Sequence, residues 1–267
     1  MLNISVIQPS YFPGDNPDEK IADFLIEKLA DVQEGSLVVL PEYSNAGGIS
    51  DKESELLALP RAEKVKAAVC RAARDKSCYI VVNVLERRDG KIRNSSYLYG
   101  KDGEVVFIYD KIHLPPSELI LGVERGEGAC ICDHDGLRFA FMTCYDVYFN
   151  EQIEYIAKFQ PDIIVVPGYQ RGERVDIIHA QAKLTAFRCN AYVARASFSM
   201  HDELHGGCSM IVSPDGQILK NIGAGTGILS CEVDPKWKYM RSAGFGGGQV
   251  RGDEFISNGL CPEVFEN

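Results

Sequence analysis

The sequence predicts an α/β protein built from two mixed β-sheets that pack face to face, with helices on the outside. Short apolar runs typical of strands alternate with segments whose apolar residues recur at helical spacing, which indicates roughly a dozen strands and four or five helices. Turn signals separate several pairs of adjacent strands, so hairpins are expected beside β-α-β crossovers. The 267 residues contain no internal repeat and are enough for one large domain.

The first half of the chain begins with a predicted strand at 2–8 and a helix from Pro17. Ile21 and Leu25 lie on an apolar face of that helix. The run 36–41 is continuously apolar, which is typical of a strand buried on both faces. We then expect a helix over about 60–76, a strand at 78–87, and a hairpin formed by 94–100 and 103–111.

In the second half, Asp135 and Gly136 separate two predicted strands within 129–144. Helices are expected over about 150–159 and 176–190. The remaining strands are expected at 162–167, 191–197, 208–220 and 227–233. We expect residues 234–267, which include a glycine-rich stretch, to form a C-terminal arm or irregular tail of a single domain spanning 1–267.

The composition argues against several classes of partner. Lys and Arg number 28 and Asp and Glu 38, so the formal net charge of −10 disfavours nucleic acid or an anionic membrane surface. The apolar runs are far too short to span a bilayer. Residues 1–12 contain no Lys or Arg, which favours a first strand over a signal peptide.

The nine cysteines bear on the compartment and on metal binding. An odd number of cysteines without an export signal predicts reduced thiols and a cytoplasmic location. Cys130, Cys132 and His134 alternate along one strand and share a face, as three metal ligands could. Alternate residues of any strand do the same, and no second cluster completes a site, so we expect no metal and no cofactor.

Three reactive side chains directly follow predicted strands. Glu42 follows the run that ends at 41, Lys111 follows the strand that ends the hairpin, and Cys144 follows the second strand of 129–144. Open α/β sheets bind their ligands at the carboxyl ends of strands. If these strands are neighbours, the three side chains converge.

Such a trio suits nucleophilic catalysis. A nearby cation and a base that takes the thiol proton both raise the reactivity of a cysteine. Glu42 can be that base, and Lys111 can stabilise the Cys144 thiolate and later an oxyanion. The backbone N–H of Tyr145 is a second candidate oxyanion donor. A lone cysteine at a strand end is more often a packed thiol, so the prediction depends on the three residues together.

Three segments resemble the signature segments of the nitrilase superfamily, also called carbon–nitrogen hydrolases. They are Pro-Glu-Tyr-Ser at 41–44, Tyr-Asp-Lys-Ile-His-Leu-Pro-Pro-Ser-Glu at 109–118, and Thr-Cys-Tyr-Asp at 143–146. Their order and intervals agree with the family as well. Residues 209–219 are similar to a late strand pair of that family, so the resemblance covers nearly the whole chain.

The resemblance implies a four-layer α-β-β-α sandwich and a catalytic triad. In that triad Glu42 is the general base and later acid, Lys111 the electrostatic stabiliser, and Cys144 the nucleophile. The family often has a second glutamate in the loop after the lysine, which would be Glu118. Glu118 would hydrogen-bond Lys111, and Glu124 and Glu127 are alternatives for that role.

The resemblance also implies a homodimer or a higher homo-oligomer, because the family commonly pairs protomers through helices near the nucleophile. The helix over 150–159 carries Ile153, Ile156, Ala157 and Phe159, which could form such a face. The alternative is that these side chains pack inward.

Five further residues are weaker candidates for substrate binding, and each could instead simply pack beside the site or face solvent. They are Tyr43, Asn45, Tyr148, Gln170 and Arg171. Tyr148 and Arg188 stand where many family amidases have an arginine and a glutamate. These departures prevent a direct transfer of substrate from better-known branches.

The sequence thus predicts an enzyme that hydrolyses a non-peptide C–N bond in a small amide or N-carbamoyl compound through a thioester. Nitrile hydrolysis on the same scaffold is an alternative, although specialised nitrilases are usually longer chains. A catalytically silent binding protein is a third hypothesis, and the presence of Glu42, Lys111 and Cys144 together argues against it.

Overall fold

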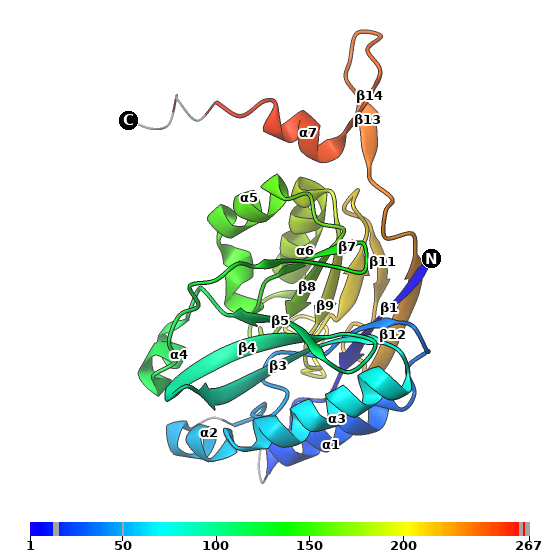
Figure 1. Ribbon diagram of the computed structural model, residues 1–267. Coiled ribbons are helices and arrows are strands. Elements are labelled where there is room, and N and C mark those ends of the chain that lie inside the picture. Colours follow the sequence, from blue (N-terminus) through cyan, green and yellow to red (C-terminus); the bar gives the residue numbers. More distant parts are fainter. Residues whose placement is uncertain (13–15, 50, 262–263, 265–267) are drawn as a thin grey trace.

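The structure is a computed structural model that describes residues 1–12, 16–49, 51–261 and 264. It confirms the predicted α-β-β-α sandwich, since α1 and α3 cover the outer face of one sheet and α5 and α6 that of the other (Figure 1). These four helices span Pro17–Leu29, Arg61–Asp75, Asn150–Lys158 and Val175–Cys189.

The first sheet has the strand order β12-β1-β2-β3-β4-β5. β1, β2 and β3 pair in parallel, whereas β3, β4 and β5 form an antiparallel meander. β5 therefore runs in the direction of β2, and both end at the same edge of the sheet. In sheet order the strands span Gly227–Val233, Leu2–Gln8, Leu37–Val39, Tyr79–Arg88, Lys91–Tyr99 and Val105–Asp110.

The second sheet has the order β11-β10-β9-β8-β7-β6. β7, β8 and β9 pair in parallel, and each outer strand pairs antiparallel. These strands span Ile218–Asn221, Met210–Val212, Tyr192–Ala196, Ile163–Pro167, Leu137–Phe141 and Ile131–His134.

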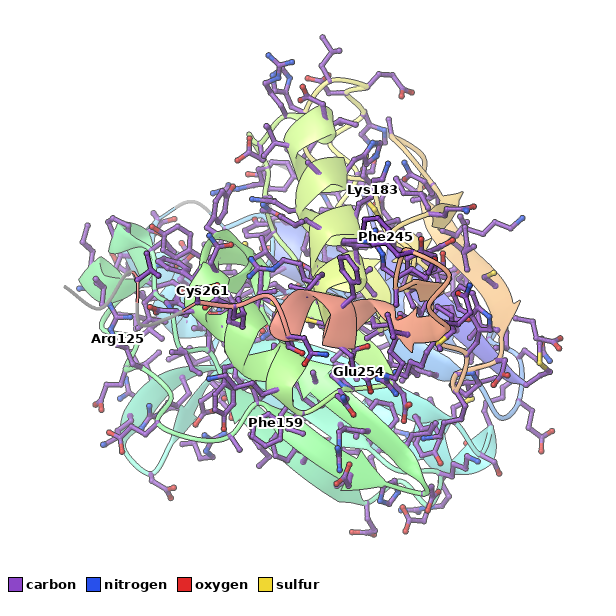
Figure 2. The ribbon with its side chains drawn as sticks, turned by 90° about the horizontal axis from the view of Figure 1, so that it is seen from above. Arg125, Phe159, Lys183, Phe245, Glu254 and Cys261 are labelled. Carbon is purple, nitrogen blue, oxygen red and sulfur yellow. The ribbon has the colours of Figure 1, made fainter. Side chains whose placement is uncertain are left out.

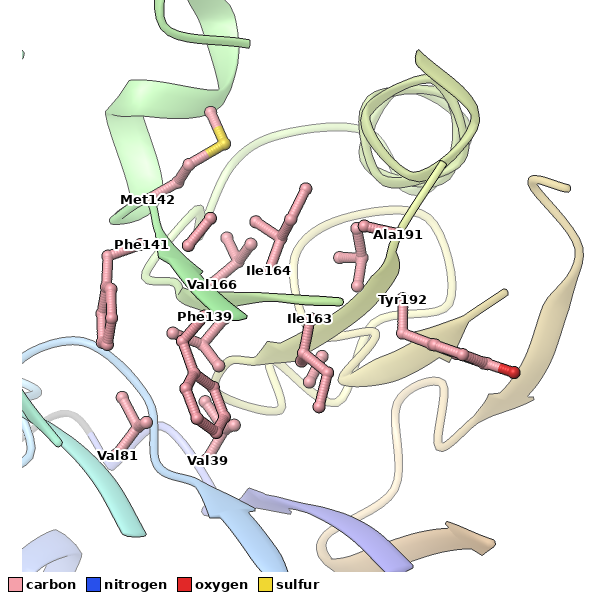
Figure 3. Packing of buried hydrophobic residues seen from close by; sticks show 14 of the residues in the cluster. Val39, Val81, Phe139, Phe141, Met142, Ile163, Ile164, Val166, Ala191 and Tyr192 are labelled. Atoms are coloured by element: carbon pink, nitrogen blue, oxygen red, sulfur yellow. The ribbon is translucent and has the colours of Figure 1, made fainter. Parts of the chain in front are cut away.

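The main hydrophobic core lies between the two sheets. Val39 and Val81 of the first sheet belong to the same buried cluster as Phe139 and Ile163 of the second (Figure 3). The inner strands are continuously apolar because their other face is covered by helices. Burying each such side chain contributes about 1.5–3 kcal/mol to folding.

The apolar residues of α5 that could pair two protomers do not form an exposed face. Ile153 and Ile156 are buried in the main core, and Ala157 packs against it. Phe159 and Tyr155 are the partly exposed apolar side chains of this region. The inward alternative is therefore correct for the two isoleucines.

The segment after Val233, expected to be an arm or irregular tail, contains a hairpin and a helix. β13 (Met240–Ser242) pairs with β14 (Gln249–Arg251), and α7 (Gly252–Ser257) follows. Seen from above, α7 lies over α5 and α6, while Phe245 is in the fully exposed hairpin turn (Figure 2). Asn190, at the end of α6, donates a hydrogen bond of 2.8 Å to Asp253 of α7.

Strand β6 and the residue before it contribute to the core. Cys130, directly before β6, and Cys132 within it are buried, and the His134 ring lies edge-on against Tyr79. Within the described residues, no group of three or more His, Cys, Asp or Glu side chains is placed to hold a metal ion. None of the described helices has the length and apolar composition that a membrane span requires.

Replacing Phe139, which is fully buried between the sheets, with alanine should leave a cavity that neighbouring strands cannot fill. We expect Phe139→Ala to lower the free energy of unfolding by about 3–5 kcal/mol, measured by urea denaturation. Leu204→Ala is the matched control, because Leu204 is 70% exposed. Equal stability of the two variants would contradict this location of the core.

Candidate active site

Glu42, Lys111, Glu118 and Cys144 line one cavity with a volume of about 370 Å³. Glu42, Lys111 and Cys144 do converge, although the strands that precede them are not neighbours in one sheet. β3 and β4 separate β2 from β5, and β7 lies in the other sheet. The residues meet because the carboxyl ends of β2 and β5 face that of β7 across the interface between the sheets.

The Lys111 ammonium is held between two carboxylates. Its Nζ lies 2.7 Å from Glu42 Oε1 and 3.0 Å from Glu118 Oε2, and all three residues are buried. Burial alone would lower the pKa of Lys111, but the charges of Glu42 and Glu118 outweigh it and raise that pKa. Lys111 is therefore a fixed and buried positive charge.

A set of amides and hydroxyls fixes the two carboxylates. Asn94 Nδ2 donates to Glu42 Oε1 at 2.8 Å and to Glu118 Oε1 at 2.6 Å. Tyr43 donates its hydroxyl to Glu118 at 2.7 Å, and Asn83 donates to Asn94 Oδ1 at 2.7 Å. Burial raises the pKa of Glu118, and its donors and Lys111 oppose that effect.

Asn83 and Asn94 were not predicted as site residues. Asn83 interrupts the apolar part of β3, whereas Asn94 lies among the polar residues of β4, and both are buried. Buried amides almost always have hydrogen-bond partners, so an asparagine inside an apolar run could have indicated a polar site at that strand.

Cys144 begins a tight turn at the end of β7, as the first residue of the 3₁₀ helix η1 (Cys144–Tyr148). Its φ of +46° lies in the left-handed region, which is unusual for a residue with a side chain and is common at functional sites. Tyr145 follows in the same turn, so its N–H is adjacent to Cys144.

Asp146 holds this turn in place. Its Oδ2 accepts from Thr143 N–H at 2.8 Å and from Tyr109 O–H at 2.7 Å. Its Oδ1 accepts from His113 N–H at 3.0 Å. Asp146 thus ties the turn of Cys144 to the loop after Lys111, and His113 braces that loop.

The surroundings of the Cys144 thiol favour its protonated form. Burial and the negative charge of Glu42 raise its pKa well above 9.0, and Lys111 opposes this only in part. Glu42 and Cys144 line the same cavity, so a carboxylate and a thiol face the same space. An acid–base pair of this kind can transfer the thiol proton as the sulfur attacks, without a pre-formed thiolate.

Of the weaker candidates, Tyr43 and Arg171 line the cavity and Asn45 does not. The Asn45 side chain is fully buried and exchanges hydrogen bonds with the backbone of Leu85 at 2.8 and 2.9 Å. Asn45 therefore anchors the loop that carries Glu42 to strand β3.

Tyr148 and Gln170 are not part of the cavity lining either. Gln170 Nε2 donates to the Tyr148 hydroxyl at 3.1 Å, and Gln170 Oε1 accepts from Arg195. Arg188 joins α6 to α5 through an ion pair of 3.0 Å with Glu154. Among the lining residues that the sequence did not single out are Glu55 and Tyr169.

Asp146→Asn should destabilise the protein, because one amide N–H₂ would face N–H and O–H donors that need acceptors. We expect a loss of about 1–3 kcal/mol in the free energy of unfolding, measured by urea denaturation. Asp176→Asn, which removes an exposed partner of Arg174, should cost less than about 1 kcal/mol. A variant at Asp146 as stable as the wild type would contradict its role in the turn.

Comparisons with known proteins agree with this architecture. A family model described as carbon-nitrogen hydrolase matches residues 20–241. A 2-oxoglutaramate amidase of Bacillus subtilis is 26% identical over 228 residues, which cover 82% of this chain and 85% of the relative. An omega-amidase of Saccharomyces cerevisiae is 24% identical over 259 residues, with 88% of each chain covered.

Among solved structures, the chain is similar in fold to an amidase from Nesterenkonia sp. The TM-score is 0.78 at 20% sequence identity, and the match covers 100% of this chain and 95% of that one. The family match spans most of the domain, including the strands that carry Glu42, Lys111 and Cys144. The chain therefore belongs to the carbon–nitrogen hydrolase family, the nitrilase superfamily, whose members act on C–N bonds other than peptide bonds.

Proposed function

We propose that this enzyme hydrolyses a small amide through a thioester on Cys144, with Glu42 as the base and Lys111 as the stabiliser of negative charge. The observation that carries the proposal is the pair of Glu42 and Lys111, 2.7 Å apart in the cavity that Cys144 also lines. No other residue in the described part of the chain is needed for proton transfer.

In the first half-reaction the Cys144 sulfur adds to the carbonyl carbon while its proton moves to Glu42. The carbonyl oxygen becomes an oxyanion that the Lys111 ammonium and the Tyr145 N–H stabilise. Glu42 then gives the proton to the leaving nitrogen, the C–N bond breaks, and ammonia or an amine departs. The acyl group remains on Cys144 as a thioester.

In the second half-reaction water attacks the thioester carbon and Glu42 takes the water proton. The C–S bond breaks, the proton returns from Glu42 to the sulfur, and the carboxylic acid leaves. Glu118 is a positioning residue in this account, because it contacts Lys111 and Asn94 and is not needed to contact the substrate.

The proposal places the thiol proton on sulfur until attack begins. Sequence reasoning assigned Lys111 the stabilisation of a thiolate, but the raised pKa of Cys144 supports a proton transfer that accompanies carbon–sulfur bond formation. Lys111 then acts mainly on the oxyanion.

An amide is favoured over a nitrile or an N-carbamoyl compound because the relatives from Bacillus subtilis and Saccharomyces cerevisiae described above are amidases. Those relatives are named for 2-oxoglutaramate and for omega-amides, so a linear amide with a second functional group at its far end is the first substrate class to examine. Homodimer formation and a cytoplasmic location stay predictions from the sequence.

Incubation with a panel of short linear amides, N-carbamoyl amino acids and nitriles, followed by intact-mass spectrometry and an ammonia assay, tests the proposal. We expect amides to give an acyl adduct that Cys144→Ala loses and Cys261→Ala, at an exposed thiol, retains. Glu42→Gln should lower kcat by about 10²–10⁴, the usual effect of losing a general base. Adducts formed only by nitriles, or amide hydrolysis that persists in Cys144→Ala, would overturn it.

A further inference from the structure

The cavity wall carries two charged side chains that the proposed reaction does not use. Arg171 lies in the loop after β8, and Glu55 lies on α2 (Lys52–Ala58). They come from different layers of the sandwich and line the cavity that also contains Cys144.

Arg171 is held in place without a counter-ion. Its guanidinium stacks 4.7 Å from the centre of the Tyr169 ring and 5.5 Å from that of Tyr11, and it donates to the Tyr11 hydroxyl at 3.1 Å. No carboxylate within the described ranges forms an ion pair with it, whereas nearby Arg174 pairs with Asp176 at 2.8 Å. Aromatic stacking leaves most N–H groups of the guanidinium available to a carboxylate.

Glu55 is a partly buried carboxylate that forms no ion pair within the described residues. Burial, with the charge of Glu118 adding to it, raises its pKa to about 7, and the charge of Arg171 only partly opposes this. No donor among the residues that the structure covers hydrogen-bonds its side chain. A carboxylate in this position gains from a positively charged ligand.

The other charged groups on the wall already have partners. Lys111 is bound by Glu42 and Glu118, and Lys52 donates to the Ile120 carbonyl at 2.8 Å. Asp51 caps α2 by accepting from Ser54 N–H at 2.9 Å. Among the described residues that line the cavity, Glu55 and Arg171 are thus the charged side chains that remain available to bind a ligand.

We propose that Glu55 and Arg171 bind the α-ammonium and α-carboxylate of a zwitterionic substrate, so that the preferred substrate is the ω-amide of an α-amino dicarboxylic acid. The amide end reaches Cys144 while the amino-acid end is held by these two residues. This inference rests on the proposed amide hydrolysis and adds its specificity. A guanidinium with free donors and a carboxylate without a cation complement a zwitterion better than a simple anion or cation.

Four amides with the same three-carbon chain separate the two charges. Glutamine carries both, glutaramate lacks the ammonium, 4-aminobutanamide lacks the carboxylate, and butyramide lacks both. We would measure binding of each to Cys144→Ala protein by calorimetry, and kcat/KM of each with the wild-type enzyme. Glutamine should bind at least about tenfold more tightly than glutaramate or 4-aminobutanamide, since each charged hydrogen-bonded contact is worth about that factor.

Two variants then test which residue binds each charged group of the substrate. In the Cys144→Ala protein, Glu55→Gln should remove the advantage of glutamine over glutaramate, and Arg171→Gln should remove its advantage over 4-aminobutanamide. Glu53→Gln, an exposed position on the same helix, and Arg174→Gln, in the loop that contains Arg171, are matched controls that should keep both ratios.

Glutaramate, 4-aminobutanamide or butyramide binding as tightly as glutamine would overturn the inference, as would ratios that Glu55→Gln and Arg171→Gln leave unchanged. A failure of the proposed reaction looks different. In that case none of the four amides would release ammonia or acylate Cys144 in the wild-type enzyme, whatever the pattern of binding.

Discussion

The ion cluster of Lys111 with Glu42 and Glu118 is the constraint on which the rest of the site depends. Removing three charges from water is costly unless geometry and hydrogen bonds compensate. The compensation comes from Asn94 and Tyr43, and Asn94 is in turn held by Asn83. The buried asparagines of β3 and β4 and the left-handed turn at Cys144 accompany this cluster where the two sheets meet.

This arrangement also sets the chemistry. Burial of the Cys144 thiol, together with the negative charge of Glu42, favours its protonated form, and Lys111 opposes this only in part. In the proposed mechanism the sulfur becomes a strong nucleophile only when Glu42 accepts its proton. That mechanism couples reactivity to the presence of a carbonyl whose oxyanion Lys111 can stabilise, a coupling that the exposed thiol of Cys261 lacks.

Much of the fold could be predicted from the sequence, because periodicity and turn residues are local signals. The strands at 2–8, 162–167 and 227–233 coincide with β1, β8 and β12. The orientation of α5 was not predictable, because alternating apolar residues do not show whether they face a core or a partner. The positions of Glu42, Lys111 and Cys144 after strands predicted their grouping on the condition that the strands are neighbours. The strands are not neighbours, because sheet order depends on long-range pairing that no local pattern encodes.

The residues predicted to bind substrate differ in what their side chains contact. Asn45 and Gln170 are buried and hydrogen-bonded to the protein, so their positions in loops that follow strands did not indicate a contact with substrate. The sequence did not indicate a role for Glu55, because a charged residue on a short helix usually faces solvent. Its significance depends on burial and on the lack of a cation, both of which are properties of the fold.

The most direct test of this account is the protonation state of Cys144 at rest. The ultraviolet absorbance of a thiolate, taken as the difference between the wild type and Cys144→Ala, can be followed through a pH titration. The account predicts a midpoint above 9.0 in the wild type and a lower one in Glu42→Gln, where the negative charge that raises the pKa is gone and Lys111 remains. A thiolate already present at neutral pH in the wild type, or a midpoint unmoved in Glu42→Gln, would contradict it.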